Sequence, residues 1–298
     1  MPLNTGNTGL TLPVTSLGRI EDRSKNASVL ATLSPQRPSL YGNVQAVRMS
    51  QKPRAEIVAE GADKSSSDVA WSSVVASPIK VQTTVRMTDE VKWADEDHRM
   101  LIVDDLVDSI GESIGRAVDL IGIHGINPAT GTQAASVTTY LNQTTNRTTG
   151  AGAPSDELIA AVGSVYGGNY SPTGLALDGG YSFALATEQY ADGRDRNPGM
   201  GFGDGTTNWR GLTVAQSNTV SGQPEAADTN LRALVGDFTQ VQWGFQRNIP
   251  ISVIEYGDPD GNGDLQRSNE IAYRAEAVLY VAVFDLDAFA AVDAPTTP

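Results

Sequence analysis

Residues 95–124, DEDHRMLIVDDLVDSIGESIGRAVDLIGIH, carry the longest helical signal in the chain. Apolar side chains recur there at the i, i+3, i+4, i+7 spacing that places them on one face of a helix. Gly122, Gly125 and Pro128 predict where that helix ends. We therefore expect one amphipathic helix from Asp95 to His124. Its outer face should be acidic and should include Asp104, Asp105, Asp108, Glu112 and Asp119.

The segment before this helix predicts a hairpin. Residues 55–59 are strand-like, and residues 69–85 return as an alternating strand rich in Val and Ile. Between them, residues 61–68 form a polar tip that includes Lys64. Because the tip offers almost no apolar side chains, we expect it to protrude rather than to pack on the chain's own core.

The rest of the chain alternates short helices and strands. Ser155 is expected to cap a helix that runs to about Tyr166, and a second helix should follow Gly179. Strands are predicted at 173–177, 211–215, 231–235, 238–243, 249–256 and 271–284, and residues 1–24 should form an extended arm. Long helix, hairpin and short helices together indicate an α+β fold.

Composition excludes several kinds of protein. The chain has 298 residues, 21 Lys+Arg against 35 Asp+Glu, no cysteine and two histidines. Disulfide scaffolds, thiolate metal sites and cysteine nucleophiles are therefore ruled out, and most Ser-His chemistry is disfavoured. A net charge of −14 disfavours gripping DNA by its phosphates. The two histidines, His98 and His124, are expected at helix ends or on the surface. We expect no enzyme active site, no cofactor, no signal peptide and no membrane span.

One acidic turn is a candidate metal site. In residues 258–265, side-chain oxygens of Asp258, Asp260 and Asn262 occupy positions 1, 3 and 5 of a calcium loop, with glycine at position 6. Position 12, which should be a bidentate glutamate, is Asn269, and the flanks predict strands instead of helices. The alternative is a tight polar turn between two strands.

The order of these elements resembles one family, the major capsid proteins of tailed bacteriophages with the Hong Kong 97-type fold. AEIVAEGADKSSSDVAW (55–71) is similar to the family's E-loop, and residues 95–124 resemble its spine helix. DLIGIHGINP (119–128) resembles the loop that follows the spine helix, and the GDF turn at 236–238 is similar to one common in the family. Residues 174–192 with WRGLTV (209–214) resemble its A-domain, and 269–276 and 281–289 its closing strands.

The resemblance implies an architecture and a function. The function would be a major capsid protein that assembles into hexamers and pentamers around phage double-stranded DNA, which it would not bind sequence-specifically. It would be located in the virion capsid after assembly in the host cytoplasm. Further implied partners are a separate scaffolding protein, a portal and decoration proteins. The implied divisions are an N-terminal arm (1–50), an E-loop hairpin (51–90), a P-domain with the spine helix (91–130), an A-domain (131–262) and closing P-domain strands with the tail (263–298).

Some members of the family crosslink the subunits of their shells covalently. The resemblance implies that Lys64, Asn269 and Glu276 would carry out this chemistry here. The lysine amine would attack the asparagine side chain of a neighbour, ammonia would leave, and the glutamate would accept the proton. Asp63, directly beside Lys64, would favour the charged amine and so oppose the attack.

Two other functions stay open at this level. An encapsulin-like compartment protein would share the fold but enclose enzymes. An acidic calcium-binding interaction module would be built around residues 258–264.

Overall fold

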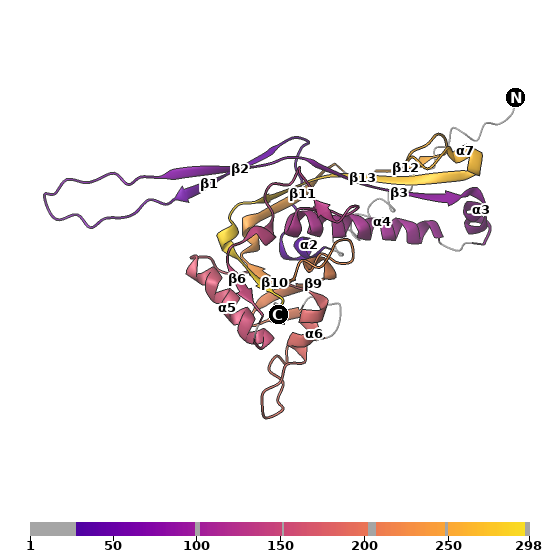
Figure 1. The fold of residues 1–298 in the computed structure, drawn as a ribbon. Coiled ribbons are helices and arrows are strands. Elements are labelled where there is room, and N and C mark those ends of the chain that lie inside the picture. Colours follow the sequence, from indigo (N-terminus) through magenta and orange to yellow (C-terminus); the bar gives the residue numbers. More distant parts are fainter. Residues whose placement is uncertain (1–27, 99–101, 151, 202–206, 248–249, 296–298) are drawn as a thin grey trace.

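In the computed structural model, residues 28–98, 102–150, 152–201, 207–247 and 250–295 are described. The predicted arm at residues 1–24 lies outside them. The molecule mixes helices and strands, as expected, and has an elongated upper part from which a compact domain hangs (Figure 1).

The elongated part is a four-stranded antiparallel sheet. The strand β13 (Glu270–Val283) lies at its centre and pairs with β11 (Val241–Arg247), β12 (Ile251–Ile254) and β3 (Ile79–Thr88). Helix α4 (Ile102–Asp119) runs along this sheet, and α3 (Asp89–His98) and α7 (Leu265–Ser268) lie at its far end (Figure 1). At fourteen residues β13 is the longest strand described, and strand-forming Ile, Tyr, Val and Leu recur along it without a proline or glycine.

The compact domain is built on a six-stranded sheet of order β6-β14-β10-β7-β9-β8. Leu175 and Leu177 of β7 pack toward α5 (Pro154–Gly167) and α6 (Gly179–Ala186), whereas Ala176 between them faces the larger core. The strands are β6 (Arg147–Thr149), β7 (Gly174–Leu177), β8 (Thr207–Trp209), β9 (Leu212–Gln216), β10 (Leu231–Gly236) and β14 (Phe289–Asp293). Alternation along β7 thus divides the interior into two clusters on opposite faces of the sheet.

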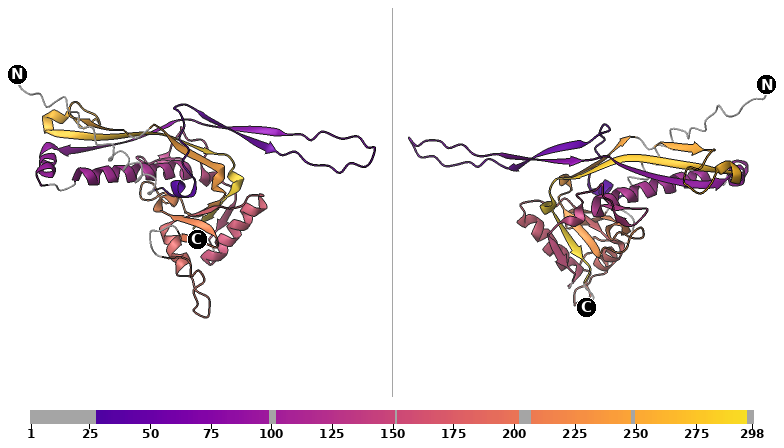
Figure 2. Two further views of the ribbon diagram at one scale, coloured as in Figure 1. Left: turned by 180° about the vertical axis from the view of Figure 1, so that it is seen from behind. Right: turned by 45° about the horizontal axis from the view of Figure 1, so that its top comes forward.

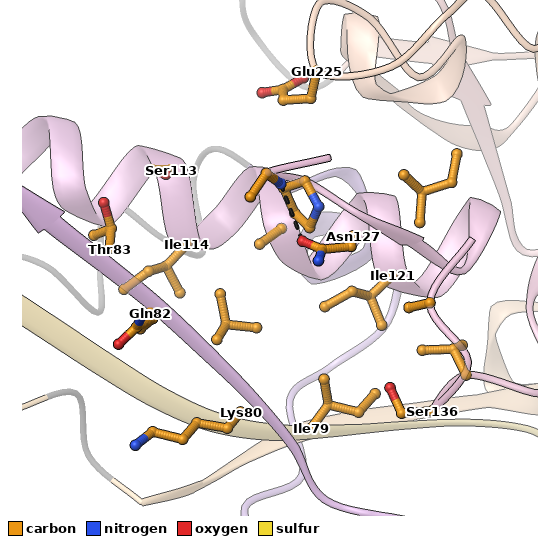
Figure 3. A pocket seen from close by; sticks show the side chains of 17 residues that line it. Ile79, Lys80, Gln82, Thr83, Ser113, Ile114, Ile121, Asn127, Ser136 and Glu225 are labelled. Atoms are coloured by element: carbon orange, nitrogen blue, oxygen red, sulfur yellow. Dashed lines mark hydrogen bonds between the residues drawn. The ribbon is translucent and has the colours of Figure 1, made fainter. Parts of the chain in front are cut away.

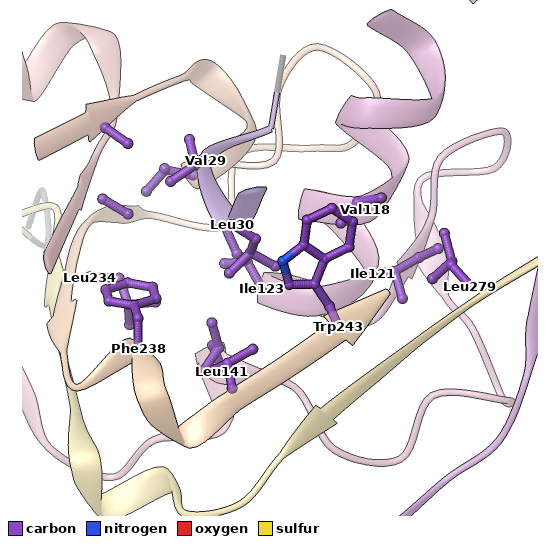
Figure 4. Packing of buried hydrophobic residues seen from close by; sticks show 14 of the residues in the cluster. Val29, Leu30, Val118, Ile121, Ile123, Leu141, Leu234, Phe238, Trp243 and Leu279 are labelled. Carbon is purple, nitrogen blue, oxygen red and sulfur yellow. The ribbon is translucent and has the colours of Figure 1, made fainter. Parts of the chain in front are cut away.

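The main core joins the two parts of the molecule. Figure 4 shows Trp243 of β11 packed among Leu30, Val118 and Ile121, which come from α2 and from the end of the long helix. Helix α2 (Val29–Leu33) supplies Leu30, so the first described residues are part of this core. The indole N–H of Trp243 donates to the Ser34 carbonyl at 2.9 Å, which holds the chain that leaves α2.

The hairpin forms, but its first strand lies earlier than predicted. β1 is Val44–Gln51 and pairs with β2 (Ala70–Ala76), so residues 55–59 belong to the long connecting loop. The expected strand 69–85 is divided at Ser77 and Pro78, since proline cannot donate to a strand ladder. Its second half becomes β3 and joins the sheet of β13. The hairpin projects far from the body in every view (Figures 1 and 2).

The long helix also differs from the prediction. It is assigned as α3 and α4, and its last turn, Leu120–His124, is a π-helix. Asp119 was expected on the surface, and this expectation is wrong because its side chain is buried. His124 was expected at the helix end or on the surface; it ends the helix, but its side chain is buried. The predicted cap of α5 is wrong too, since Ala153 is the N-cap and Pro154 begins the helix. Ser155 is buried and bonded to Glu188.

The remaining short elements are the paired strands β4 (Ile126–Asn127) and β5 (Thr132–Gln133) and four single turns of 3-10 helix. These turns are Leu141–Gln143, Asn218–Val220, Phe238–Gln240 and Leu286–Ala288. None of the helices within the described residues is long and apolar enough to span a membrane.

Candidate assembly surfaces

One face of the hairpin holds it to the body. Successive residues of a strand point to opposite faces, so Val44, Val74 and Ala76 share one face. These side chains pack against Tyr280 and Ala282 of β13 in a small separate cluster. The base of the hairpin is therefore fixed to the body.

A salt bridge strengthens that attachment. Arg48 lies on the same face of the hairpin, 2.5 Å from the Asp285 carboxylate, and donates to the Phe284 carbonyl at 3.1 Å. Asp285 also accepts from the Tyr170 hydroxyl, and burial together with this carboxylate raises the pKa of Tyr170 to about 12.

The opposite face of the hairpin is apolar and open. Val47, Trp71 and Val75 lie on it, and Trp71 is 63% exposed. Ile57, in the connecting loop beyond the strands, is fully exposed. Aliphatic and aromatic side chains gathered on a projecting element indicate a surface that another molecule covers.

Side-chain hydrogen bonds shape the connecting loop. Glu56 accepts from the Ser65 amide at 2.8 Å and from its hydroxyl at 2.5 Å, and these bonds hold the pKa of Glu56 below its usual value. The Arg54 amide donates to the Ser67 hydroxyl at 2.7 Å. These bonds cross the loop and keep its two sides together without a strand ladder. Lys64 is exposed near the tip.

Asn269 lies at the other end of the molecule, beside a polar cavity of about 520 Å³. It ends α7 in the left-handed conformation with φ 54°, and its carbonyl accepts from the Asp89 amide at 2.9 Å. The cavity is lined by Asp89, Lys92, Trp93, Glu255, Tyr256, Gln266, Asn269, Glu270 and Ile271. Three carboxylates and two aromatic rings in that set suit a cationic side chain.

Glu276 lies farther along β13, where it forms a 2.8 Å ion pair with Lys80 of the adjacent strand. At about 3.3 Å per residue, the six positions from Glu270 to Glu276 span roughly 20 Å. One chain therefore does not bring Lys64, Asn269 and Glu276 together. Any site that used all three would need more than one subunit.

The acidic turn at residues 258–264 surrounds an arginine. Arg86 of β3 binds Asp260 with two nitrogens, Asp258 at 3.1 Å and the Gly263 carbonyl at 2.9 Å. Arg86 holds the pKa of Asp260 well below its usual value. No group of three or more His, Cys, Asp or Glu side chains in the described part of the chain is arranged to hold a metal ion. The geometry favours a loop anchored by a guanidinium over a calcium loop.

A second cavity, of about 510 Å³, lies between β3 and α4 (Figure 3). Its lining is mainly aliphatic, with hydroxyl and amide groups interspersed. Lys80 and Glu225 are the titratable side chains in this lining, and each has a partner: Glu276 for Lys80 and Arg116 for Glu225. The cavity thus lacks the free acid–base pair that catalysis would need.

Sequence analysis missed a buried polar cluster at the end of α4. The Asp119 carboxylate accepts hydrogen bonds from the Ser28 hydroxyl, the Val29 and Leu30 amides and the Thr219 hydroxyl, at 2.6 to 3.0 Å. Burial raises the pKa of Asp119, and these four bonds oppose that shift.

His124 extends the same cluster. Its Nε2 lies 3.1 Å and 3.0 Å from the Thr219 and Val220 carbonyls, and its Nδ1 accepts from the Asn142 amide at 3.3 Å. The ring is therefore neutral, with its proton on Nε2. Burial lowers the pKa of His124. The only sign of this cluster in the sequence was Asp119, an acidic residue at the end of an apolar helical stripe. An acidic residue in that position predicts a solvent-exposed side chain, so the cluster was missed.

Comparison with known proteins identifies the chain. Residues 8–294 match the model of the phage capsid family. The chain belongs to the phage capsid family. A solved structure from Mycobacterium phage Ogopogo shares 43% identity over 90% of this chain and 92% of that chain, with a TM-score of 0.82. One from Gordonia phage Cozz shares 27% identity over 91% and 87%, with a TM-score of 0.78.

The fold extends to more distant shells. A chain titled as the capsid of a native GTA particle computed with C5 symmetry shares 13% identity over 91% of each chain, with a TM-score of 0.64. No curated protein matches the sequence. The capsid chain is thus a structural component of the virion rather than an enzyme, it has the Hong Kong 97-like capsid fold, and it associates with itself in an icosahedral shell.

Proposed function

We propose that this capsid chain forms the hexamers and pentamers of a tailed-phage head that encloses double-stranded DNA. The observation that carries the proposal is the projecting hairpin, whose apolar outer face has no partner among the described residues of its own chain. A monomer gains nothing from such a face, whereas a subunit in a ring buries it on a neighbour. The relative with 43% identity is a phage protein, which favours a viral shell over an encapsulin-like compartment.

The domain division predicted from sequence is part of this proposal. The hairpin corresponds to the E-loop and α4 to the spine helix. The sheet of β13 corresponds to the P-domain, and the six-stranded sheet with α5 and α6 to the A-domain. The proposal keeps the predicted boundaries at residues 50, 90, 130 and 262 as divisions of the sequence, but by their sheets it gives β3, β11 and β12 to the P-domain and β14 to the A-domain. The first strand of the hairpin begins at Val44, before the predicted start of the E-loop at residue 51.

We extend the proposal to a covalent bond between subunits. Lys64 from a hairpin tip would enter the cavity beside Asn269 of a neighbour, where carboxylates and aromatic rings suit a cation. Because these carboxylates favour the charged amine, Lys64 must first lose one proton to solvent. Its neutral Nζ would then attack the asparagine Cγ, an amide bond would form, and ammonia would leave. Glu276 of a third subunit would take the amine proton and pass it to the leaving nitrogen. Glu276 must first separate from Lys80.

The charge of the chain fits the proposed contents of the shell. A net charge of −14 limits adhesion of packaged DNA to the protein, which agrees with enclosure without sequence-specific binding. A scaffolding protein, a portal and decoration proteins complete the proposed set of partners.

Electron microscopy of the purified protein, with and without its scaffold, tests the assembly. Closed shells of uniform size, or rings of five and six subunits, are the expected result. A compact monomer under every assembly condition would overturn the proposal.

A boiled denaturing gel of the shells tests the bond. Covalent ladders should appear for the wild type and for the control Lys52→Arg, and should be absent for Lys64→Arg and Asn269→Asp. Mass spectrometry should find linked peptides lighter by one ammonia per bond. Shells that dissolve entirely into monomers would reject the bond and leave the assembly proposal intact.

A further inference from the structure

Beyond its first turn, where the exposed Asp156 pairs with Arg196, the outer face of α5 is uncharged and open to solvent. Residues 158–167, LIAAVGSVYG, contain no charged side chain, although 19% of the chain is charged. On the outer side of this helix, Ile159 is 41% exposed and Tyr166 is 59% exposed. The inner side of α5 already packs on the six-stranded sheet. The outer side is therefore apolar without belonging to the chain's own core.

A shallow groove of about 210 Å³ adjoins this face. Ile159, Val162 and Tyr166 line it from α5, and Pro172 lines it from the loop before β7. Trp209 of β8, Leu212 of β9 and Arg210 in the turn between these strands complete the lining. Gly163 lies one turn from Ile159, and a Cβ added there would meet nothing within 4 Å. The small exposed residues of α5 allow another backbone to approach closely, and the groove has room for an apolar side chain.

The position of α5 indicates what covers this face. Helix α5 lies on the side of the compact domain toward which the hairpin projects, and α6 lies toward the other side; both views from front and back agree (Figures 1 and 2). Subunits that close a ring head to tail must carry two different faces that fit each other. On α6 the large aromatic Phe183 is 61% exposed. The domain thus has a mainly apolar groove that includes Arg210 on one side and an exposed aromatic side chain on the other.

We propose that the outer face of α5 seats a second copy of this chain, which contacts it with the α6 side of its own compact domain. The neighbour held by the hairpin would rest on α5 of the same subunit, and Phe183 of the neighbour would approach the groove. This inference rests on the proposed ring assembly and adds the surfaces through which successive compact domains meet.

Because the chain contains no cysteine, single cysteines report on this contact directly. In Gly163→Cys the thiol should react with a maleimide in free subunits and be protected at least tenfold in shells. With a short bismaleimide, shells of the double variant Gly163→Cys/Phe183→Cys should give a ladder of linked subunits. Either single variant should give no dimers, since the two faces differ.

Three results would overturn the proposal. Equal reactivity of Gly163→Cys in shells and in free subunits would mean that the face is open. Protection without a ladder would put another side of the neighbour on α5. Dimers of Gly163→Cys alone would make the contact symmetric.

A charge on the same face gives an independent test. Gly163→Glu has room in the monomer and should unfold at or above the wild-type temperature, yet its yield of shells should fall at least tenfold. Ser109→Glu, on the exposed side of α4, is the matched control and should assemble normally. Normal shells from Gly163→Glu would reject the proposed contact on α5 and leave the proposed function intact. The proposed function is rejected only if the wild type makes no shells.

Discussion

The hydroxyl of Ser28 donates a 2.6 Å hydrogen bond to the carboxylate of Asp119, which lies 91 positions away in the sequence. With the Val29 and Leu30 amides, this bond fastens the first described residues to the last residue of α4. The Thr219 hydroxyl adds a third segment at 2.8 Å. A single buried carboxylate thus holds together the start of the described chain, the long helix and the loop that precedes β10.

Asp119→Asn should destabilise the monomer by about 2–4 kcal/mol. The asparagine side chain keeps one acceptor oxygen, but its NH2 group would face hydroxyl and amide groups that donate to Asp119 in the wild type. These buried donors would lose their acceptor, and buried unsatisfied polar groups destabilise the folded state. Urea unfolding followed by circular dichroism measures the loss. Asp105→Asn is the matched control: Asp105 lies on the exposed side of the same helix, and its loss should change stability by less than about 0.5 kcal/mol. Equal effects of the two substitutions would contradict the buried cluster.

Stability should fall as the pH drops below 6.5, the ordinary pKa of histidine. Burial lowers the pKa of His124 in the native state, so the unfolded chain binds this proton first and acid favours unfolding. Asp119 acts in the opposite direction at lower pH, because its raised pKa lets the native state take up the proton first.

Unfolding temperatures of the wild type and of His124→Gln between pH 8 and pH 5 test the role of His124. The variant should be less stable at pH 8 and should lose less stability between pH 6.5 and pH 5. Parallel pH profiles for the two proteins would show that His124 does not set this dependence.

Two glycines should respond in opposite directions to substitution by alanine. At Gly244 in β11 an added Cβ would lie 2.2 Å from the Arg37 carbonyl oxygen, a backbone atom that cannot move aside. Gly244→Ala should therefore cost about 3 kcal/mol or more. Gly163→Ala in α5 meets open space and should stabilise the helix by about 0.5–1 kcal/mol. Denaturant midpoints compare the two, and similar midpoints would show that packing against Arg37 is not tight.

Arg86→Gln should release the turn at residues 258–264. The guanidinium contacts two carboxylates and a carbonyl of that turn, and glutamine cannot replace these contacts. Hydrogen exchange across the turn should accelerate. Arg267→Gln, in the adjacent α7 and exposed, should leave the exchange unchanged.

Millimolar calcium should not slow exchange in the wild type, because Arg86 already neutralises the acidic side chains of the turn. Protection by calcium, or a rise in unfolding temperature on its addition, would instead restore the calcium loop suggested by the sequence.

Part of the assembly surface was accessible from local sequence. The polar run around Lys64 marked the projecting loop, since a stretch without apolar side chains cannot pack on a core. The position of the first hairpin strand was missed because residues 44–51 and 55–59 have similar strand propensity, and pairing with β2 chose between them. The cavity beside Asn269 was not foreseeable, because α3, β13 and the loop after β12 meet only in the folded chain.

By itself the sequence determined the features that depend on neighbours a few positions apart. These are the amphipathic period of α4, the long run of strand-forming residues in β13, the polar hairpin loop and the absence of cysteine chemistry. Only the tertiary structure decided whether isolated polar side chains are buried or exposed. An aspartate at the end of an apolar stripe can face water or accept four buried hydrogen bonds, and the donors to Asp119 lie 89 to 100 positions away. The local sequence pattern determines which face of a helix or strand is buried. Which charged side chains are buried with that face depends on hydrogen-bond partners that long-range packing brings close.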